Sequence, residues 1–147
     1  MNKTDSKFLK LAIEKSKQSM DEGNFPAGAV VVKNDKILAT AVSSPYPNLF
    51  HPDSKAIAKA YEKHGPLIGA TLYVGLESCL MCTGVVYWSG IRRIVYAAAK
   101  SKLSSDYYET PEDIKNLIKK FNEPIELVYA KEFEEEALAV VKEWEKK

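Results

Sequence analysis

The sequence predicts one α/β domain, a three-layer sandwich with a central five-stranded mixed sheet and helices on both faces. Short β-rich runs alternate with segments of helical period along the chain. One strand–helix–strand unit within about thirty residues is typical of a parallel pair, whereas an earlier two-residue turn between β-rich runs is typical of a hairpin. A chain of 147 residues, 46% of them hydrophobic, suits one core, so we expect a single domain over 1–147.

In the first half of the chain, the period of the apolar residues and the turn residues define the elements. A helical period closes on Gly23, Asn34 and Asp35 occupy a turn between two β-rich runs, and Pro52 suits the first turn of a helix. The elements expected here are a helix within 6–23, a hairpin over 27–42, a loop over 43–50 and a helix over 52–63.

In the second half, short apolar runs alternate with amphipathic segments. Pro111 stands where the fourth helix is expected to begin, and Trp144 is expected to lie in the core. The elements expected here are a strand over 70–76, a helix over 79–88, a strand over 92–98, a helix over 111–121, a strand over 125–130 and a helix over 132–144.

Composition excludes several classes of protein. The formal net charge is +1, far from the strongly basic balance of proteins that bind nucleic-acid backbones, and this favours a small substrate. The chain has no apolar run of membrane-spanning length, and its start, MNKTDSKFLK, is too polar for a signal peptide. We therefore expect a soluble cytoplasmic protein that does not bind membranes.

The only two cysteines form the motif ESCLMC, as Cys79 and Cys82, between a predicted strand and a predicted helix. This motif is compatible with a redox pair, with two small buried hydrophobic residues, or with part of a zinc site. His51, in FHPDSKAIAKAY, would otherwise only cap a helix, and it supplies a third ligand. Two thiolates and one imidazole leave a fourth zinc position open for water, which is the arrangement of catalytic zinc sites.

With these residues in place, the sequence resembles the zinc-dependent nucleobase and nucleoside deaminases of the cytidine deaminase superfamily, whose signature is H-x-E…P-C-x-x-C. FPAGAVVVKNDKIL resembles the opening hairpin of that family, and GATLYVGLESCLMCTGVVYWSGIRRIVYAA resembles its cysteine-bearing segment. The closest branches are the tRNA adenosine, guanine and cytosine deaminases, and SSDYYETPEDI and EALAVVKEW favour the guanine or nucleoside side. The resemblance implies a cytidine deaminase-like fold and Zn²⁺ held by His51, Cys79 and Cys82.

The resemblance also assigns roles around the metal. Asp53 stands where the family has its proton-shuttling glutamate, and backbone N–H groups near Cys79 are expected to hydrogen-bond the substrate. The sequence departs from the family pattern at four positions, Pro52, Asp53, Ser78 in place of a proline, and Ser43 in place of a base-recognising asparagine. Asn48 is a candidate to take over base recognition, although a loop asparagine that only turns the chain is an alternative.

Several aromatic residues are candidates for substrate contact. Tyr87 and Trp88 follow the cysteines and could stack on a base, face a partner subunit or pack in the core. Tyr107 and Tyr108 stand in a predicted loop, where a substrate lid is common. Trp88, Tyr107 and Tyr108 therefore join Ser43, Asn48 and Ser78 as predicted substrate-binding residues.

The sequence thus predicts hydrolytic deamination of a nucleobase or nucleoside, such as guanine, cytosine or a related ring, with Asp53 as proton shuttle in place of glutamate. The alternatives are a weak or inactive zinc-stabilised deaminase-like binding or regulatory protein and a tRNA adenosine deaminase, since the near-neutral charge disfavours tRNA without excluding it. A redox protein leaves His51 unexplained. The resemblance further implies a homodimer, with the cysteine-bearing helix near the interface.

Overall fold

Five strands and five α-helices alternate along the chain in the computed structural model, which describes residues 1–147. The helices are α1 (Lys3–Asp21), α2 (Pro52–His64), α3 (Leu80–Ser89), α4 (Ile114–Ile118) and α5 (Glu134–Glu145). The strands are β1 (Gly28–Lys33), β2 (Lys36–Val42), β3 (Thr71–Leu76), β4 (Arg93–Ala98) and β5 (Glu126–Tyr129).

The strands form one mixed sheet in the order β2-β1-β3-β4-β5. β1 pairs antiparallel with β2 and with β3, whereas β3–β4 and β4–β5 are parallel. The hairpin turn is made by Asn34 and Asp35, both with positive φ (51° and 61°), as a two-residue type I′ turn requires. The predicted five-stranded mixed sheet is therefore confirmed, including its antiparallel hairpin and its parallel βαβ unit.

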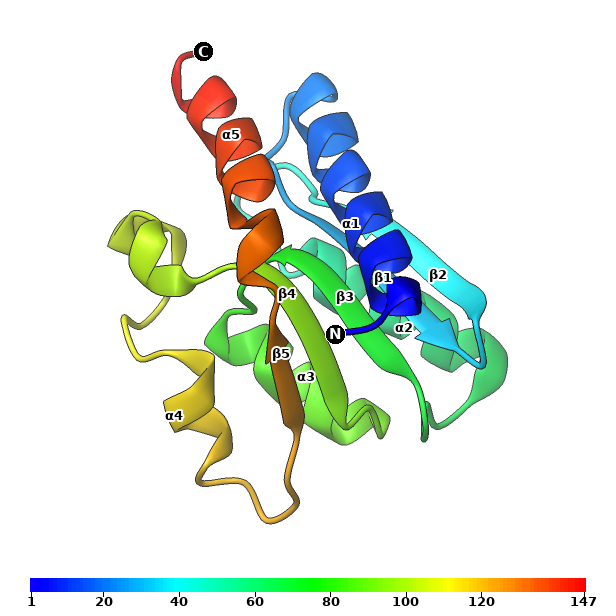
Figure 1. The fold of residues 1–147 in the computed structure, drawn as a ribbon. Helices are drawn as coiled ribbons and strands as arrows, with labels where there is room; N and C mark the ends of the chain where they lie inside the picture. Colours follow the sequence, from blue (N-terminus) through cyan, green and yellow to red (C-terminus); the bar gives the residue numbers. More distant parts are fainter.

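Helices cover both faces of the sheet and enclose two cores (Figure 1). On one face, α1 and α5 pack over a cluster that includes Phe8, Leu9 and Val95; on the other, α2 and α3 pack over a cluster that includes Ile57 and Ile94. Strand β3 contributes to both clusters, because its successive side chains point to opposite faces. The predicted three-layer arrangement is confirmed.

The fourth helix is much shorter than the predicted segment 111–121. It begins after Asp113, whose side chain accepts a hydrogen bond from the Asn116 N–H at 2.8 Å, and it ends at Ile118. Pro111 therefore precedes the helix and does not open it, because Asp113 is the residue that caps it. Short 3-10 turns at Lys100–Lys102 and Ser105–Tyr107 shape the segment before α4.

A buried ion pair fixes the start of α1 to the sheet. Asp5 is 1% exposed, and its carboxylate accepts two hydrogen bonds from the Arg93 guanidinium, both at 2.8 Å, and one from the Tyr73 hydroxyl at 2.6 Å. Arg93 holds the pKa of Asp5 well below its usual range. Glu126 also approaches Arg93, at 3.4 Å, but its side chain is 64% exposed.

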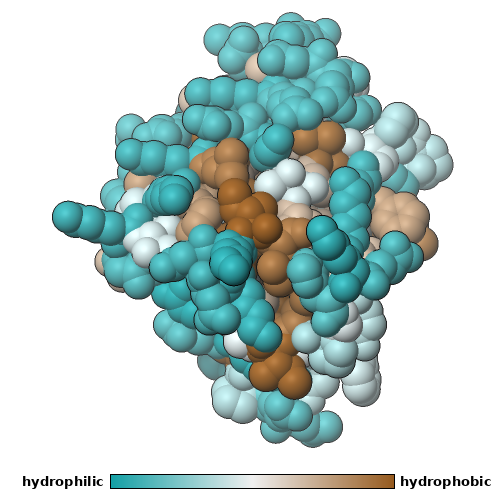
Figure 2. All heavy atoms as spheres, turned by 90° about the vertical axis from the view of Figure 1, so that its right-hand side faces the viewer, coloured by the Kyte–Doolittle hydropathy of each residue, from teal (hydrophilic) through white to brown (hydrophobic).

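The edge strand β2 has no strand on its outer side, and Figure 2 shows a narrow apolar strip bordered by polar side chains on this side of the molecule. Ile37, on β2, is 48% exposed. None of the helices has the length and apolar character needed to cross a bilayer.

One edge of the sheet collects the chain segments that carry the predicted site. Because β1 runs antiparallel to β2 and β3, the start of β1 lies beside the ends of β2 and β3. The parallel strand β4 ends at the same edge. α1 packs so closely on the start of β1 that a Cβ at Gly28 would lie 2.5 Å from the Ala12 carbonyl oxygen. In sheets of this kind, ligands bind in the crevice beyond the carboxyl ends of the parallel strands.

Candidate active site

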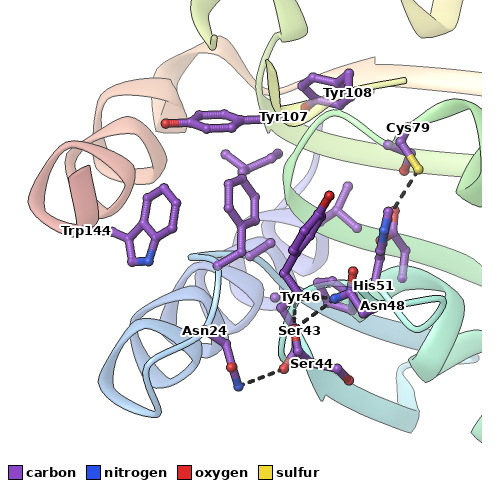
Figure 3. Close-up of a pocket in the computed structure, with 18 of the residues that line it drawn as sticks. Asn24, Ser43, Ser44, Tyr46, Asn48, His51, Cys79, Tyr107, Tyr108 and Trp144 are labelled. Carbon is purple, nitrogen blue, oxygen red and sulfur yellow. Dashed lines mark hydrogen bonds between the residues drawn. The ribbon is translucent and has the colours of Figure 1, made fainter. Parts of the chain in front are cut away.

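A cavity of about 570 Å³ opens at this edge of the sheet. Its walls come from the turn before β1, the loop after β2, the start of α2, the end of β3, residues 106–108 and Trp144. Figure 3 shows His51 and Cys79 at one end of the cavity and Trp144 at the other. The volume falls in the range of about 300–1,000 Å³ in which proteins bind drug-sized ligands.

The three predicted metal ligands meet at one end of this cavity. The Nδ1 atom of His51 lies 3.4 Å from the Cys79 Sγ atom and 3.6 Å from the Cys82 Sγ atom. Both cysteines are buried and free of disulfide. His51 is the N-cap residue directly before α2, Cys79 is the N-cap residue directly before α3, and Cys82 lies in the first turn of α3. Two helix starts therefore bring the three side chains together.

The donor set fits zinc. With Zn–S bonds of about 2.3 Å and a Zn–N bond of about 2.05 Å, a tetrahedral site separates its sulfur and nitrogen ligand atoms by about 3.6 Å. Both sulfur–nitrogen distances in the structure agree with this value, and the three ligand atoms all lie within 4.8 Å of one another. His51 makes no capping hydrogen bond to α2, so its imidazole is available to a metal.

The protonation of the cluster suits metal binding. Hydrogen bonding from Cys82, reinforced by His51, holds the pKa of the Cys79 thiol below its usual range. The Cys82 N–H also donates to the Cys79 sulfur, over 3.4 Å. In turn, the neighbouring Cys79 sulfur raises the pKa of Cys82, and the hydrogen bond with Cys79 raises that of His51. Cys79 is thus the thiol most readily converted to the thiolate that binds metal.

Asp53 lies in the first turn of α2 and lines the same cavity. It is 6% exposed and takes part in none of the ion pairs of the structure. Pro52 precedes it as the first residue of α2, where its ring fixes the backbone φ angle. Asp53 is therefore a nearly buried acid beside the metal cluster without a partner cation.

Ser78 carries the one buried side-chain polar atom of the structure that lacks a hydrogen-bond partner. The residue is 2% exposed, lines the cavity and directly precedes Cys79. A buried hydroxyl without a partner costs about 1–3 kcal/mol, and such groups are rare in folded proteins. The unpartnered hydroxyl beside the metal cluster therefore suggests that a ligand completes its hydrogen bonding.

Ser43 and Asn48 line the cavity, but part of their polar groups serve their own loop. The Asn48 side-chain amide donates to the Ser44 carbonyl at 2.9 Å and to the Ser43 hydroxyl at 3.4 Å. The Ser43 N–H donates to Ser19 Oγ at 3.1 Å, and its carbonyl accepts from the Asn24 side chain at 3.2 Å. The structure thus brings both predicted residues to the cavity and also gives Asn48 the loop-closing role that was its alternative.

Tyr107 and Tyr108 both line the cavity, whereas Trp88 does not. The Tyr108 hydroxyl donates to the Glu77 carbonyl at 2.7 Å, and the Tyr107 hydroxyl donates to the Glu145 carboxylate. Trp88 is 83% exposed at the far end of α3. Since α3 rises about 1.5 Å per residue, it carries Trp88 about 13 Å along the helix axis from Cys79 and about 9 Å from Cys82.

Sequence reasoning missed part of the cavity wall. Phe25, Tyr46 and Asp106 were not expected there, and Trp144, expected in the core, packs at the border of the core and lines the cavity. Tyr46 is 93% exposed on the loop after β2. No local pattern marks these residues, because they come from separate parts of the chain that meet only in the folded protein.

The first N–H groups of α3 are hydrogen-bonded to Glu109, a residue that the sequence analysis did not single out. The Glu109 carboxylate accepts hydrogen bonds from the Leu80 and Met81 N–H groups, each at 3.2 Å. Burial opposes its ionisation, but these and other backbone hydrogen bonds keep the pKa of Glu109 below its usual range. The Leu80 and Met81 N–H groups therefore already have an acceptor in Glu109, and substrate binding by backbone N–H groups near Cys79 stays a prediction.

A second acid ties the tyrosine segment to the sheet. Glu77, 4% exposed at the end of β3, accepts hydrogen bonds from the Lys100 and Ile114 N–H groups at 2.8 and 2.7 Å. The Lys100 ammonium lies 4.0 Å from the Glu77 carboxylate and 4.7 Å from the centre of the Tyr108 ring. These contacts hold the segment after β4 against the cavity.

Comparison with known proteins identifies the family. Residues 2–98 match the family model of the cytidine and deoxycytidylate deaminase zinc-binding region. The chain is 32% identical over 107 residues to a probable cytosine deaminase of Schizosaccharomyces pombe, an alignment that covers 70% of this chain and 65% of that protein. It is 36% identical over 103 residues to a tRNA-specific adenosine deaminase of Bacillus subtilis, covering 67% of this chain and 64% of that protein.

The solved structure of the guanine deaminase of Nitrosomonas europaea shares the fold, with a TM-score of 0.80 at 20% identity over 95% of this chain and 84% of that one. The chain spans slightly less than two thirds of the length of the two curated relatives above. The matched region contains the three clustered ligands and Asp53, whereas residues 106–108 and Trp144 lie beyond it.

The family, the fold and the zinc cofactor predicted from the sequence are therefore confirmed. The Cys-x-x-Cys motif belongs to a metal-binding domain, which removes the redox alternative. The chain belongs to the family of the cytidine and deoxycytidylate deaminase zinc-binding region.

Proposed function

We propose that the chain is a zinc-dependent hydrolase that deaminates a nucleobase or nucleoside, such as guanine, cytosine or a related ring. One observation carries the proposal: the three ligand atoms of His51, Cys79 and Cys82 meet at tetrahedral distances beside the nearly buried acid Asp53, in a cavity that can hold such a ring. The family of the chain and the names of its relatives support the same reaction class.

The chemistry divides between the metal and the acid. His51, Cys79 and Cys82 would hold zinc, which when bound makes a water molecule nucleophilic near neutral pH. The reaction exchanges a ring amino group for an oxygen, consuming one water and releasing one ammonia. The Asp53 carboxylate takes one proton from the attacking water and delivers it to the ring nitrogen. It then takes the second proton, from the new hydroxyl group on the ring carbon, and passes it to the amino group, so that the C–N bond breaks, a C=O bond forms and ammonia leaves.

Asp53 suits this role because it is outside the ligand set and without a counter-ion. Its side chain is shorter than the glutamate that the family signature contains, by one C–C bond of about 1.5 Å. Pro52 fixes the backbone φ angle directly before Asp53, in the helical turn from which Asp53 lines the cavity.

Substrate binding is assigned to the remaining polar and aromatic residues of the cavity. Ser78 offers its unpartnered hydroxyl next to Cys79, and Ser43 and Asn48 offer polar groups from the loop after β2. Tyr107 and Tyr108 offer aromatic surface from the opposite wall. This set can orient a planar heterocycle by a few hydrogen bonds within mainly apolar surroundings, as is usual in small-molecule sites.

Deamination of an adenosine in tRNA is a second candidate, supported by the 36% identity to the tRNA-specific adenosine deaminase. The cavity argues against it, because none of its 23 lining residues is Lys or Arg, the side chains that usually bind phosphate. A binding or regulatory protein that keeps the metal without turnover is the third candidate, motivated by the shorter arm of Asp53.

A screen for ammonia release separates these candidates. Zinc-loaded protein is offered free bases, nucleosides, nucleotides and unmodified tRNA, each carrying an exocyclic ring amine. We expect release from a base or nucleoside and none from tRNA. Release from tRNA alone would support the second candidate, and no release from any compound by a protein with one zinc per chain would support the third.

A homodimer and a cytoplasmic location, which the family resemblance implies, stay predictions. Trp88 and Leu80, on the cysteine-bearing helix α3, are 83% and 44% exposed, and exposed aromatic and aliphatic side chains on one helix support an interface there. Light scattering of the zinc-loaded protein should give twice the chain mass of 16.4 kDa, and Trp88→Glu should convert it to the monomer.

A further inference from the structure

The cavity has a second end, of which the proposed function uses only Tyr107. Three aromatic residues that line the cavity, Phe25, Tyr107 and Trp144, are here called the outer wall. Tyr107 and Trp144 lie on the side away from the metal ligands (Figure 3), and Phe25 packs against both. The Phe25 ring centre lies 5.0 Å from that of Tyr107 and 5.2 Å from that of Trp144, each in an edge-to-face arrangement. The outer wall is therefore a packed surface rather than three separate side chains.

The outer wall is anchored to the rest of the fold. The Tyr107 hydroxyl donates to the Glu145 carboxylate, so the last turn of α5 and the segment before α4 are joined at this point. Tyr108, next in the chain, is hydrogen-bonded to the Glu77 carbonyl. These contacts keep the rings in place before any ligand arrives, which reduces the entropy that a ligand must offset on binding.

The size of the cavity implies a ligand that is longer than a base. A ring held beside Asp53 and Ser78, at the metal end, leaves the outer wall in contact with water. Covering apolar surface that is in contact with water favours binding. A substrate that carries a further group beyond its base covers both ends, and a free base covers one.

The charge of the lining restricts that further group. No Lys or Arg lines the cavity, whereas Asp53, Glu77 and Asp106 do. The nearest buried cation, Lys100, is already committed to the Glu77 carboxylate and donates to the Glu112 carbonyl. Asp106 directly precedes Tyr107 of the outer wall, lines the cavity and is exposed. A phosphate in the cavity would meet carboxylates and no Lys or Arg, so the lining disfavours anions.

A ribose or deoxyribose satisfies both conditions. Its C–H face can pack on aromatic rings, and its hydroxyl groups can donate to a carboxylate such as that of Asp106. We propose that this site selects an unphosphorylated nucleoside over both the free base and the nucleoside monophosphate, with the sugar held by the outer wall and Asp106. The proposal rests on the deaminase function proposed above and names its substrate class.

The residues that carry this selection stand partly outside the family match. Tyr107, Asp106 and Trp144 follow residue 98, where the match to the zinc-binding region ends. Membership of the family therefore leaves the outer end of the cavity undefined, and the lining of this chain decides it.

The test measures binding without turnover, by using reaction products as probes. Zinc-loaded protein is titrated by calorimetry with uracil, uridine and uridine 5′-monophosphate, and with xanthine, xanthosine and xanthosine 5′-monophosphate. In at least one series we expect the nucleoside to bind about tenfold more tightly than both the base and the monophosphate, which corresponds to about 1.4 kcal/mol. Equal affinities, a preference for the base or the monophosphate, or no binding in either series would overturn the proposal.

Two variants locate the selection. Trp144→Ala should weaken nucleoside binding about tenfold and leave base binding unchanged. Asp106→Lys, at an exposed position that is expected to tolerate the change, should raise the affinity for the monophosphate relative to the nucleoside. Circular dichroism and zinc content confirm that each variant is folded. Two outcomes would contradict the assignment of the sugar to the outer wall and Asp106. One is that Trp144→Ala weakens base and nucleoside binding by the same factor; the other is that Asp106→Lys leaves the preference for the nucleoside over the monophosphate unchanged.

A fluorescence signal gives an independent reading of position. The chain has two tryptophans, so Trp88→Phe leaves Trp144 as the only one. Nucleoside should change the fluorescence of this variant, and the free base should not. The ammonia screen decides separately whether the bound nucleoside class is turned over: selective binding without ammonia release would defeat the proposed function, whereas release from bases alone would defeat the present inference.

Discussion

The Nδ1 atom of His51 lies 3.4 Å from the Sγ atom of Cys79, although 28 residues separate them in the sequence. Each residue stands at the beginning of a helix, α2 for His51 and α3 for Cys79. The metal cluster therefore depends on how these two helices are placed at one edge of the sheet, and loss of either side chain leaves an incomplete ligand set.

The first prediction concerns the metal. The purified protein should contain one zinc per chain, and His51→Ala should lose it together with part of the stability, because metal binding and folding are coupled at such sites. Metal analysis and thermal unfolding check both effects. His64→Ala is the matched control, since the chain has only two histidines and His64 lies in the last turn of α2. Full zinc content in His51→Ala would contradict the assignment.

The second prediction concerns the proton shuttle. Asp53→Asn keeps the shape of the side chain but cannot carry the proton, so kcat should fall by about 100- to 10,000-fold with zinc content and melting temperature unchanged. Asp53→Glu keeps a carboxylate and should remain active. Initial rates of ammonia release measure both variants. Equal inactivity of the wild type and both variants on every compound would remove the enzyme hypothesis.

The third prediction concerns the unpartnered hydroxyl of Ser78. Ser78→Ala removes a buried polar atom that lacks a partner, so the free energy of unfolding should rise by about 1 kcal/mol. Substrate affinity should fall, because the hydroxyl is assigned to the ligand. Ser89→Ala is the control, since Ser89 is equally buried but donates to the Val86 carbonyl at 2.7 Å, and its loss should destabilise. Destabilisation by Ser78→Ala with unchanged affinity would assign the hydroxyl a purely structural role.

The fourth prediction concerns acid stability. Arg93 keeps the pKa of the Asp5 carboxyl low in the folded protein. Just below pH 3.9, about the ordinary aspartate pKa, Asp5 is therefore protonated in the unfolded chain but still ionised in the folded chain. The contribution of Asp5 is therefore complete at neutral pH and is lost as the pH falls below about 4. Asp5→Asn should cost about 2 kcal/mol at pH 7, and its difference from the wild type should shrink in acid.

Urea unfolding between pH 3 and 7 measures this difference. Glu126→Gln is the control, because Glu126 meets the same Arg93 at 3.4 Å with a side chain that is 64% exposed, and exposed pairs contribute little. A pH-independent difference between Asp5→Asn and the wild type would show that the ion pair is not the source of the stability.

The parts of the structure that sequence could predict are those set by local patterns. Asn34 and Asp35 define the hairpin because these residue types tolerate the positive φ angles that a two-residue turn requires. The spacing of Cys79 and Cys82 indicates a shared helix face, and this inference does not depend on the rest of the fold. His51 was found by the chemistry of an incomplete ligand set rather than by its surroundings.

The parts that sequence could not predict depend on contacts between distant segments. Phe25, Tyr107 and Trp144 form one wall because a turn, a loop and the last helix meet, and no periodicity encodes that meeting. Glu109 caps α3 from 28 and 29 residues away. Trp88 was placed at the substrate because it follows the cysteines on their helix, but the axis of α3 carries it away from them.

Glu77 joins two parts of the protein that carry different functional residues. It receives the N–H groups of Lys100 and Ile114, and so attaches the segment after residue 98 to the strand that leads to Cys79. The metal-binding residues lie before that segment, and Tyr107, Asp106 and Trp144 lie after its start. A descendant of this chain could therefore acquire a new substrate by replacing Asp106, Tyr107 and Trp144 while inheriting the metal centre unaltered, provided that Glu77 still receives its two N–H groups and Glu109 still caps α3.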